Sequence, residues 1–145
     1  MKRLELEREI TINKPVKDVF AYVTDPKTLK DWRIGLIEHK QITPEINEKG
    51  SKSAETVTIL GKNFKVLQEI VDYKENSKRT QRVKLGPITL NMIEDYQEID
   101  GKTILKVKGM TELKGIQQFF GTAILRRIGS QLSDELAKIK SNLEA

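Results

Sequence analysis

Polar side chains occur at five positions where the alternation of strand residues predicts an inward-facing side chain. They are Gln68, Gln81 and Glu94, with Arg79 opposite Glu94, and Arg8 on the matching face of the first strand. Buried polar groups need partners, and polar groups that converge on an apolar wall orient ligands in cavities. In one interpretation, Arg79 and Glu94 form an ordinary cross-strand ion pair near a sheet edge, which contributes little stability in water. In the other, Glu94 and Gln81 hydrogen-bond a hydroxyl or carbonyl group of a ligand, and Arg79 or Arg8 binds its acidic end.

Residues for conventional catalysis or metal binding are scarce. Glu94 would need a pKa raised by burial to act as an acid or base, and the adjacent arginine opposes that shift. His39 is the only histidine, and its charged and polar neighbours predict a position on the surface of the second strand. The chain has no cysteine, no acidic or histidine cluster with metal-ligand spacing and no glycine-rich phosphate loop. We therefore predict no catalytic residue, metal or cofactor, although a cavity that only steers a reactive substrate would leave no such trace.

Length and composition indicate one domain, residues 1–145, with enough chain to bury a core without disulfides. The net charge of +5 comes from 26 basic and 21 acidic residues that are interleaved, so no nucleic-acid partner is expected. The charged N-terminal stretch is unlike a signal peptide, and no apolar run is as long as a membrane span. We expect a cytoplasmic protein, monomeric or weakly dimeric.

The first third of the chain predicts a strand, two short helices and a second strand. Leu4 to Ile12 alternate apolar and polar residues, as in a strand with one buried face. Pro15 suits the first turn of a helix, which must end at Asp25 because the residue before Pro26 is disfavoured in a helix. The elements that follow are a short helix over 27–32, a strand over 34–42 and a loop over 44–50.

Turn signals between residues 53 and 111 predict a meander of antiparallel strands. Gly61-Lys62 is expected to be the first two-residue loop, and later turns are expected at 74–77, 86–87 and 100–101. The predicted opposite pairs are Ile59 with Phe64, Val57 with Val66, Glu55 with Gln68, Val83 with Leu90, Gln81 with Met92, and Tyr96 with Leu105. Every turn keeps the apolar residues on one face, whereas a slip of one residue would turn them outward.

The C-terminal stretch from Thr122 to Leu143 predicts a long amphipathic helix. At about 100° per residue its apolar residues fall in an arc of about 140°, and charged residues are expected outside it. Gly121 and Gly129 leave this face bare and suggest room for a ligand or a bend. Phe119 and Phe120 fall outside the arc, so either they belong to a separate turn before the helix or they border a portal or contact surface.

Several of these segments resemble the helix-grip family, also called SRPBCC or START-like, which includes polyketide cyclase/dehydrase-type and birch-pollen-allergen proteins. The resembling segments are 10–15 running into 19–23, Thr24-Asp25-Pro26 with Trp32, Leu60-Gly61-Lys62, 68–73 and 101–103. The resemblance implies a seven-stranded antiparallel sheet curled round the C-terminal helix, with a cavity between them. It also implies an apolar or amphipathic small-molecule ligand and carries over no shared catalytic or metal residues.

We therefore predict an α+β helix-grip domain that binds a hydrophobic or amphipathic molecule such as a lipid, polyketide or quinone. Trp32 either fills the space under the short helices or lines the cavity mouth. The candidate cavity residues are Arg8, Trp32, Val57, Ile59, Phe64, Val66, Gln68, Gln81, Val83, Leu90, Met92, Glu94, Leu105, Val107, Gly121, Leu125 and Gly129.

Two alternative functions remain open. One is an enzyme of the polyketide cyclase/dehydrase type, which would use Arg8, Arg79 or Glu94. The other is a macromolecule-docking module that uses Phe119, Phe120 and the basic surface. A peripheral contact with a membrane is also compatible with these two aromatic residues.

Overall fold

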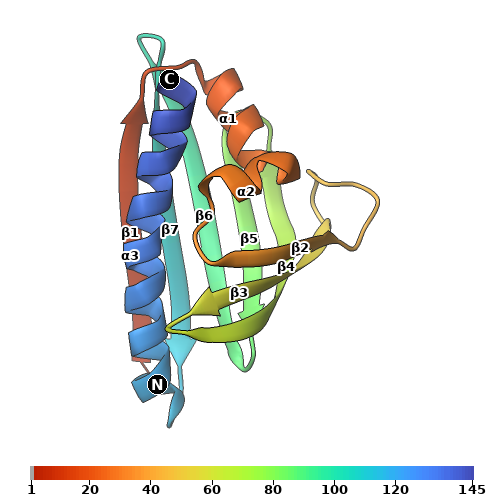
Figure 1. Ribbon diagram of the computed structural model, residues 1–145, viewed down its shortest axis with the longest axis vertical. Helices are drawn as coiled ribbons and strands as arrows, with labels where there is room; N and C mark the ends of the chain where they lie inside the picture. Colours follow the sequence, from red (N-terminus) through yellow and green to blue (C-terminus); the bar gives the residue numbers. More distant parts are fainter. Residues whose placement is uncertain (1) are drawn as a thin grey trace.

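Seven antiparallel strands form one curved sheet in the spatial order β1-β7-β6-β5-β4-β3-β2 (Figure 1). The computed structural model describes residues 2–145. The strands are β1 (Lys2–Ile12), β2 (Leu36–Gln41), β3 (Lys52–Ile59), β4 (Lys62–Lys74), β5 (Lys78–Leu85), β6 (Ile88–Ile99) and β7 (Lys102–Leu113). Strands β2 to β7 follow one another as a meander, and β1 pairs with β7. The predicted seven-stranded antiparallel sheet is confirmed.

Helices cover the inner face of this sheet. They are α1 (Val16–Thr24), the 3-10 turn η1 (Pro26–Thr28), α2 (Leu29–Trp32) and α3 (Gln117–Glu144). The long helix α3 runs beside β1, while α1 and α2 lie near its C-terminal end (Figure 1). As predicted, α1 ends just before Asp25, which then accepts a hydrogen bond from the Lys27 backbone. Among residues 2–145, no helix is both long and apolar enough to cross a membrane.

The predicted strand register is correct for two hairpins and wrong for one. Val83 lies opposite Leu90, and Tyr96 lies opposite Leu105, as expected. The β3–β4 loop is Leu60-Gly61, both with positive φ, so Val57 lies opposite Phe64 and not opposite Val66. Glu55 consequently pairs with Val66, and Gln68 pairs with Ser53. The pairing is shifted by two residues. Because side chains alternate between the two faces of a sheet with a period of two, the residues predicted to point inward still do so.

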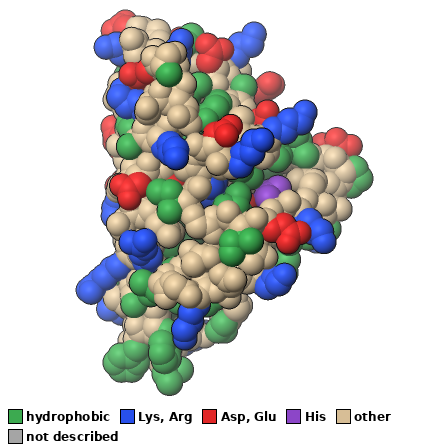
Figure 2. Space-filling model, in the orientation of Figure 1, with side chains coloured by type: hydrophobic (Ala, Val, Ile, Leu, Met, Phe, Trp, Pro, Cys, Tyr) green, Lys and Arg blue, Asp and Glu red, His purple; other side chains and the backbone are tan. Residues whose placement is uncertain are grey.

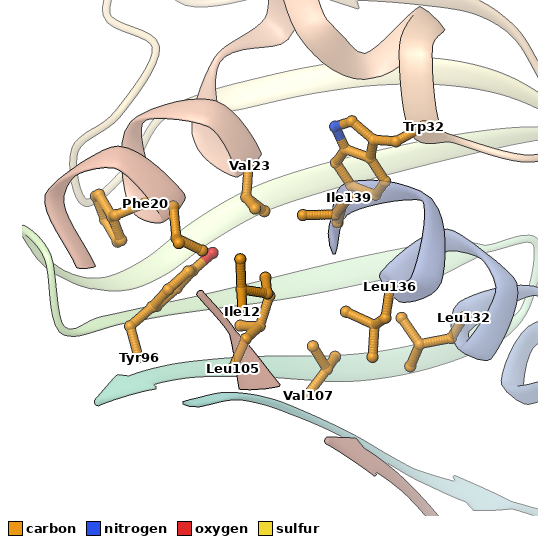
Figure 3. Close-up of a cluster of buried hydrophobic side chains, with 11 residues drawn as sticks. Ile12, Phe20, Val23, Trp32, Tyr96, Leu105, Val107, Leu132, Leu136 and Ile139 are labelled. Atoms are coloured by element: carbon orange, nitrogen blue, oxygen red, sulfur yellow. The ribbon is translucent and has the colours of Figure 1, made fainter. Parts of the chain in front are cut away.

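The largest hydrophobic cluster joins the first strand, α1, α2 and the C-terminal half of α3 (Figure 3). Ile12 and Leu105 are fully buried at its centre. The Phe20 ring lies 4.8 Å from that of Tyr96 in an edge-to-face arrangement, which aromatic pairs favour. Two smaller clusters lie under the N-terminal half of α3, around Val57 and around Leu90. Helix α3 therefore makes its most extensive hydrophobic contacts at its C-terminal end.

Two expectations about α3 are wrong. The helix begins at Gln117, so Phe119 and Phe120 lie in its first turns and not in a separate turn. Glu135 is buried, although the charged residues were expected to face water. At about 100° per residue Glu135 falls between the directions of Ile124 and Ile128, inside the apolar arc. The burial of Glu135 therefore follows from the helix geometry. The cost of burying its carboxylate is offset by contacts with Arg33 and with the Ile34 backbone N–H, which are described below.

Candidate functional site

A cavity of about 210 Å³ lies between the inner face of the sheet and α3. Its wall is mainly apolar and includes residues from β2 to β7, from the short helices and from both halves of α3. Most of the predicted cavity residues lie on this wall: Trp32, Val57, Ile59, Val66, Gln68, Gln81, Val83, Leu90, Met92, Glu94, Leu105, Val107, Gly121 and Leu125. The strand alternation brings these side chains together, since each strand residue among them occupies an inward position.

Three predicted cavity residues, Arg8, Phe64 and Gly129, lie outside the cavity wall. The Nε of Arg8 donates to Oγ of Ser133 at 2.8 Å, so this side chain ties β1 to α3. A Cβ at Gly129 would lie 2.8 Å from the Arg8 guanidinium, which shows that this glycine faces β1. Phe64 packs beside the cluster around Val57.

Gly121 touches the cavity but does not leave the helix face bare. A Cβ added there would lie 2.6 Å from a methyl carbon of Leu113 on β7. The absence of a side chain therefore lets α3 approach the sheet closely. The suggestion that both glycines leave room for a ligand is wrong for Gly129, and for Gly121 the space is occupied by Leu113.

A polar cluster that the sequence analysis missed lies at the β2–β3 side of the cavity. Both Arg33 amino nitrogens contact the Glu55 carboxylate, at 3.2 and 3.1 Å, and the Arg33 Nε lies 3.3 Å from Glu135. His39 Nδ1 lies 2.8 Å from Oε2 of Glu55, and Gln68 donates to Oε1 at 3.0 Å. We call these five residues the Glu55 cluster; all of them lie on the cavity wall.

The two carboxylates of the Glu55 cluster have opposite pKa shifts. Burial alone would raise the pKa of Glu55, but the His39 hydrogen bond and the Arg33 charge outweigh it and lower the pKa. For Glu135 burial dominates and raises the pKa, against the charge of Arg33 and the Ile34 backbone N–H. Glu55 is therefore a firmly ionised acceptor, whereas Glu135 is the more readily protonated carboxyl group.

His39 was expected on the surface, and the structure places it on the inner face of β2 instead. It pairs across the sheet with the buried Glu55, and only 18% of its side chain is exposed. Its second ring nitrogen, Nε2, is buried and has no hydrogen-bond partner within the described part of the chain. Buried polar atoms in proteins nearly always have a partner, so this nitrogen is an unusual feature of a residue on the cavity wall.

A second polar group surrounds Arg79 on the neighbouring strands. Arg79 makes two hydrogen bonds to the Glu94 carboxylate, at 3.1 and 2.9 Å, and the Tyr96 hydroxyl donates to Glu94 at 2.8 Å. Burial first, and then the Glu94 charge, raise the pKa of Tyr96 well above its ordinary value, so the hydroxyl remains protonated. Arg79 and Glu94 thus form the predicted ion pair, but the pair is buried between two interior strands of the sheet and not exposed near a sheet edge, and both side chains also reach the cavity wall.

Trp32 packs in the hydrophobic core under the short helices, as one alternative predicted, and it also contributes to the cavity wall. It is 7% exposed in the main hydrophobic cluster. Its indole nitrogen donates to the Thr28 hydroxyl at 3.3 Å. The residue therefore fills the space under α2 and closes that side of the cavity.

Exposed apolar side chains gather at the beginning of α3. Ile116, Phe119 and Phe120 are 69%, 78% and 64% exposed, and apolar side chains are prominent at the lower end of Figure 2. The apolar surface that the docking hypothesis requires is therefore present.

In residues 2–145, no group of three or more histidine, cysteine or acidic side chains is placed to hold a metal ion.

Solved structures with the same architecture identify the fold. The crystal structure of Ara h 8.0201 matches with a TM-score of 0.77 at 16% identity, over 97% of both chains. TTHA0849 from Thermus thermophilus matches with a TM-score of 0.79 at 13% identity, over 95% of both chains. DynU16, from the dynemicin biosynthetic locus, matches with a TM-score of 0.71 at 16% identity, over 97% of this chain and 47% of that chain. The fold is the helix grip.

Sequence comparison adds nothing to the helix-grip assignment: no family model and no curated protein matches the chain. At the identities of the structural matches, the likeness establishes the fold alone. The function must therefore be argued from the cavity and its polar groups.

Proposed function

We propose that this helix-grip protein binds a hydrophobic or amphipathic small molecule between the sheet and α3. The observation that carries the proposal is the cavity of about 210 Å³, whose apolar wall is interrupted by two polar groups. Apolar walls with a few fixed polar groups are typical of small-molecule sites. The wall supplies affinity through the burial of ligand surface, at about 25 cal/mol per Å², and the polar groups select orientation.

The cavity size narrows the ligand class. Typical ligand pockets measure roughly 300–1,000 Å³, so this cavity suits a small member of the lipid, polyketide or quinone classes. A fused bicyclic aromatic ring is a suitable probe, because it is rigid and mostly apolar.

Filling the cavity tests the proposal. Val83 lies on the cavity wall and Lys84 is exposed on the opposite face of β5, so Val83→Trp and Lys84→Trp form a matched pair. Isothermal titration with 2-naphthol should show binding to the wild type and to Lys84→Trp, and at least about tenfold weaker binding to Val83→Trp because the indole occupies the site. Ile128→Phe provides a milder substitution from the helix side if the tryptophan unfolds the protein.

Native mass spectrometry of protein purified from its own host gives an independent measurement, since a bound molecule appears as added mass. Equal affinity of the wild type and both cavity variants would contradict the proposal. So would an absence of bound 2-naphthol together with an absence of any co-purified molecule.

A further inference from the structure

The unpartnered Nε2 of His39 suggests a specific chemical requirement for the ligand. This nitrogen is buried, belongs to a side chain on the cavity wall and has no partner in residues 2–145. A polar atom left in this state costs free energy that a hydrogen bond from a bound molecule restores. The inference rests on the proposed function, because it concerns the same cavity.

The partners of Glu55 determine which ring nitrogen of His39 carries the proton. Arg33 and Gln68 both donate to the Glu55 carboxylate, which is only 1% exposed. A lowered pKa keeps this carboxylate ionised, so it can only accept hydrogen bonds. The 2.8 Å contact therefore requires a proton on His39 Nδ1. In the neutral ring, Nε2 then carries a lone pair and is a hydrogen-bond acceptor.

The position of the ring is fixed by the sheet. His39 and Glu55 are direct cross-strand neighbours on the inner face of β2 and β3. Arg33 holds the far side of the same carboxylate, and Arg33 is itself anchored by Glu135 from α3. Elements on both sides of the cavity thus hold the acceptor in place, as is required for selective recognition of a single ligand group.

We propose that His39 Nε2 accepts a hydrogen bond from a hydroxyl group of the bound molecule, so that the protein selects hydroxylated aromatic or alicyclic ligands over hydrocarbon analogues. The shared chemistry is an apolar ring system with one O–H donor. His39 acts in binding and orientation, and the Glu55 cluster positions it. Sites built to hydrogen-bond a hydroxyl discriminate strongly against analogues that lack it, because the partner atom is then left buried and unpaired.

The test compares 2-naphthol with naphthalene, which lacks only the hydroxyl group. Isothermal titration should show about tenfold tighter binding of 2-naphthol relative to naphthalene in the wild type, after correction for the transfer of each probe from water to an apolar solvent. His39→Phe should remove this preference. Lys40→Phe, which alters the next residue on the opposite face of β2, should retain it. His39→Gln, whose amide oxygen can serve as an acceptor, should retain part of it.

Nitrogen NMR of the single histidine provides a readout that a purely structural role would not change. At a pH at which the ring is neutral, Nε2 should carry no proton, and its signal should shift on addition of 2-naphthol but not of naphthalene. A protonated Nε2, or equal shifts with both probes, would overturn the inference.

The outcomes separate this inference from the proposed function. If both probes bind and the corrected preference is the same in wild type and His39→Phe, the cavity binds ligands and the role of His39 is disproved. If neither probe binds the wild type, the inference fails together with the use of the cavity for such molecules. An ordered water on Nε2 that 2-naphthol does not displace would give the first of these results.

Discussion

Arg33 is shared by two buried carboxylates that respond to it differently. Glu55 accepts one hydrogen bond from the guanidinium, has a second ion-pair contact with it, and accepts further hydrogen bonds from His39 and Gln68, whereas Glu135 has one contact with Arg33 and one with the Ile34 backbone. At Glu55 the hydrogen bonds and charges of His39 and Arg33 together outweigh burial and lower the pKa, whereas at Glu135 burial prevails over Arg33 and the Ile34 backbone and raises it. The ion network is therefore asymmetric, with Glu55 as its fixed anion.

This asymmetry predicts opposite pH dependence for two amide variants. The pKa of Glu55 is lowered, so its stabilisation is present above the ordinary value of 4.5 and is lost as the pH falls through the lowered pKa. The pKa of Glu135 is raised, so its ionisation reduces stability as the pH rises from 4.5 through the raised pKa. Compared with wild type, Glu55→Gln should lose stability and Glu135→Gln should gain stability as the pH rises.

Urea unfolding of the wild type and both variants from about pH 3 to about pH 8 checks this prediction. At the acidic end Glu135 is protonated because its pKa is raised, so this series also measures the effect of the Glu135 amide without the charge. If the difference in free energy of unfolding from wild type changed with pH in the same direction for both variants, the opposite pKa shifts assigned to Glu55 and Glu135 would be contradicted.

The residues of the Glu55 cluster show what the sequence can reveal at this scale. Glu55 shares the strand parity of Val57 and Ile59, so the same alternation that predicted their inward positions also places Glu55 inward. The helical wheel likewise places Glu135 inside the apolar arc. Arg33 lies in the irregular segment between α2 and β2, where no periodicity applies. Its central position therefore depends on tertiary structure alone.

At the scale of elements, the segment from α2 to β2 depends on one close backbone contact. Gly35 has a φ of +76°, and a Cβ there would lie 2.6 Å from the Thr58 carbonyl oxygen. Its own carbonyl accepts a hydrogen bond from the Thr58 N–H at 2.7 Å. This contact fixes the chain immediately after Arg33 and Ile34, both of which reach Glu135.

Gly35→Ala and Gly61→Ala form a matched pair that separates crowding from backbone strain. Gly61 has the same φ of +76°, but nothing lies within 4 Å of an added Cβ. Gly61→Ala should reduce the free energy of unfolding by about 1–2 kcal/mol, the cost of the left-handed conformation. Gly35→Ala should reduce it by clearly more, since the backbone of β3 must also move. Equal losses in urea unfolding would show that the close contact adjusts without cost.

Hairpin loops show how far sequence specifies these elements. Gly86-Pro87 and Asp100-Gly101 identify their loops correctly, and the facing pairs follow. Gly61 was assigned to the first position of its loop, whereas it occupies the second position after Leu60, a residue seldom found with a positive φ. The extra residue near Val71 in β4 is similarly hidden, because a bulge has no strong sequence signature. The sequence therefore predicts which face of the sheet a strand residue occupies better than it predicts which residue lies opposite it.

At the scale of the whole molecule, α3 contacts hydrophobic clusters of different sizes at its two ends. Leu132, Leu136 and Ile139 belong to the largest cluster, together with α1, α2 and β1. The N-terminal half places Ile128 against the two smaller clusters, and both halves of α3 contribute residues to the cavity wall. Local stability follows the extent of apolar packing, so the two halves of α3 should differ in their opening free energies.

Hydrogen exchange should reveal this difference and its dependence on ligand. In the free protein, amides of residues 121–130 should exchange faster than those of residues 133–142, because fewer buried side chains hold the N-terminal half. If opening of that half releases the ligand, 2-naphthol at about 100 times its dissociation constant should slow the faster set by up to about a hundredfold. In Val83→Trp the same addition should have little effect, since the indole already fills the cavity. Uniform slowing along α3, or slowing confined to its C-terminal half, would show that the ligand is not released through opening of residues 121–130.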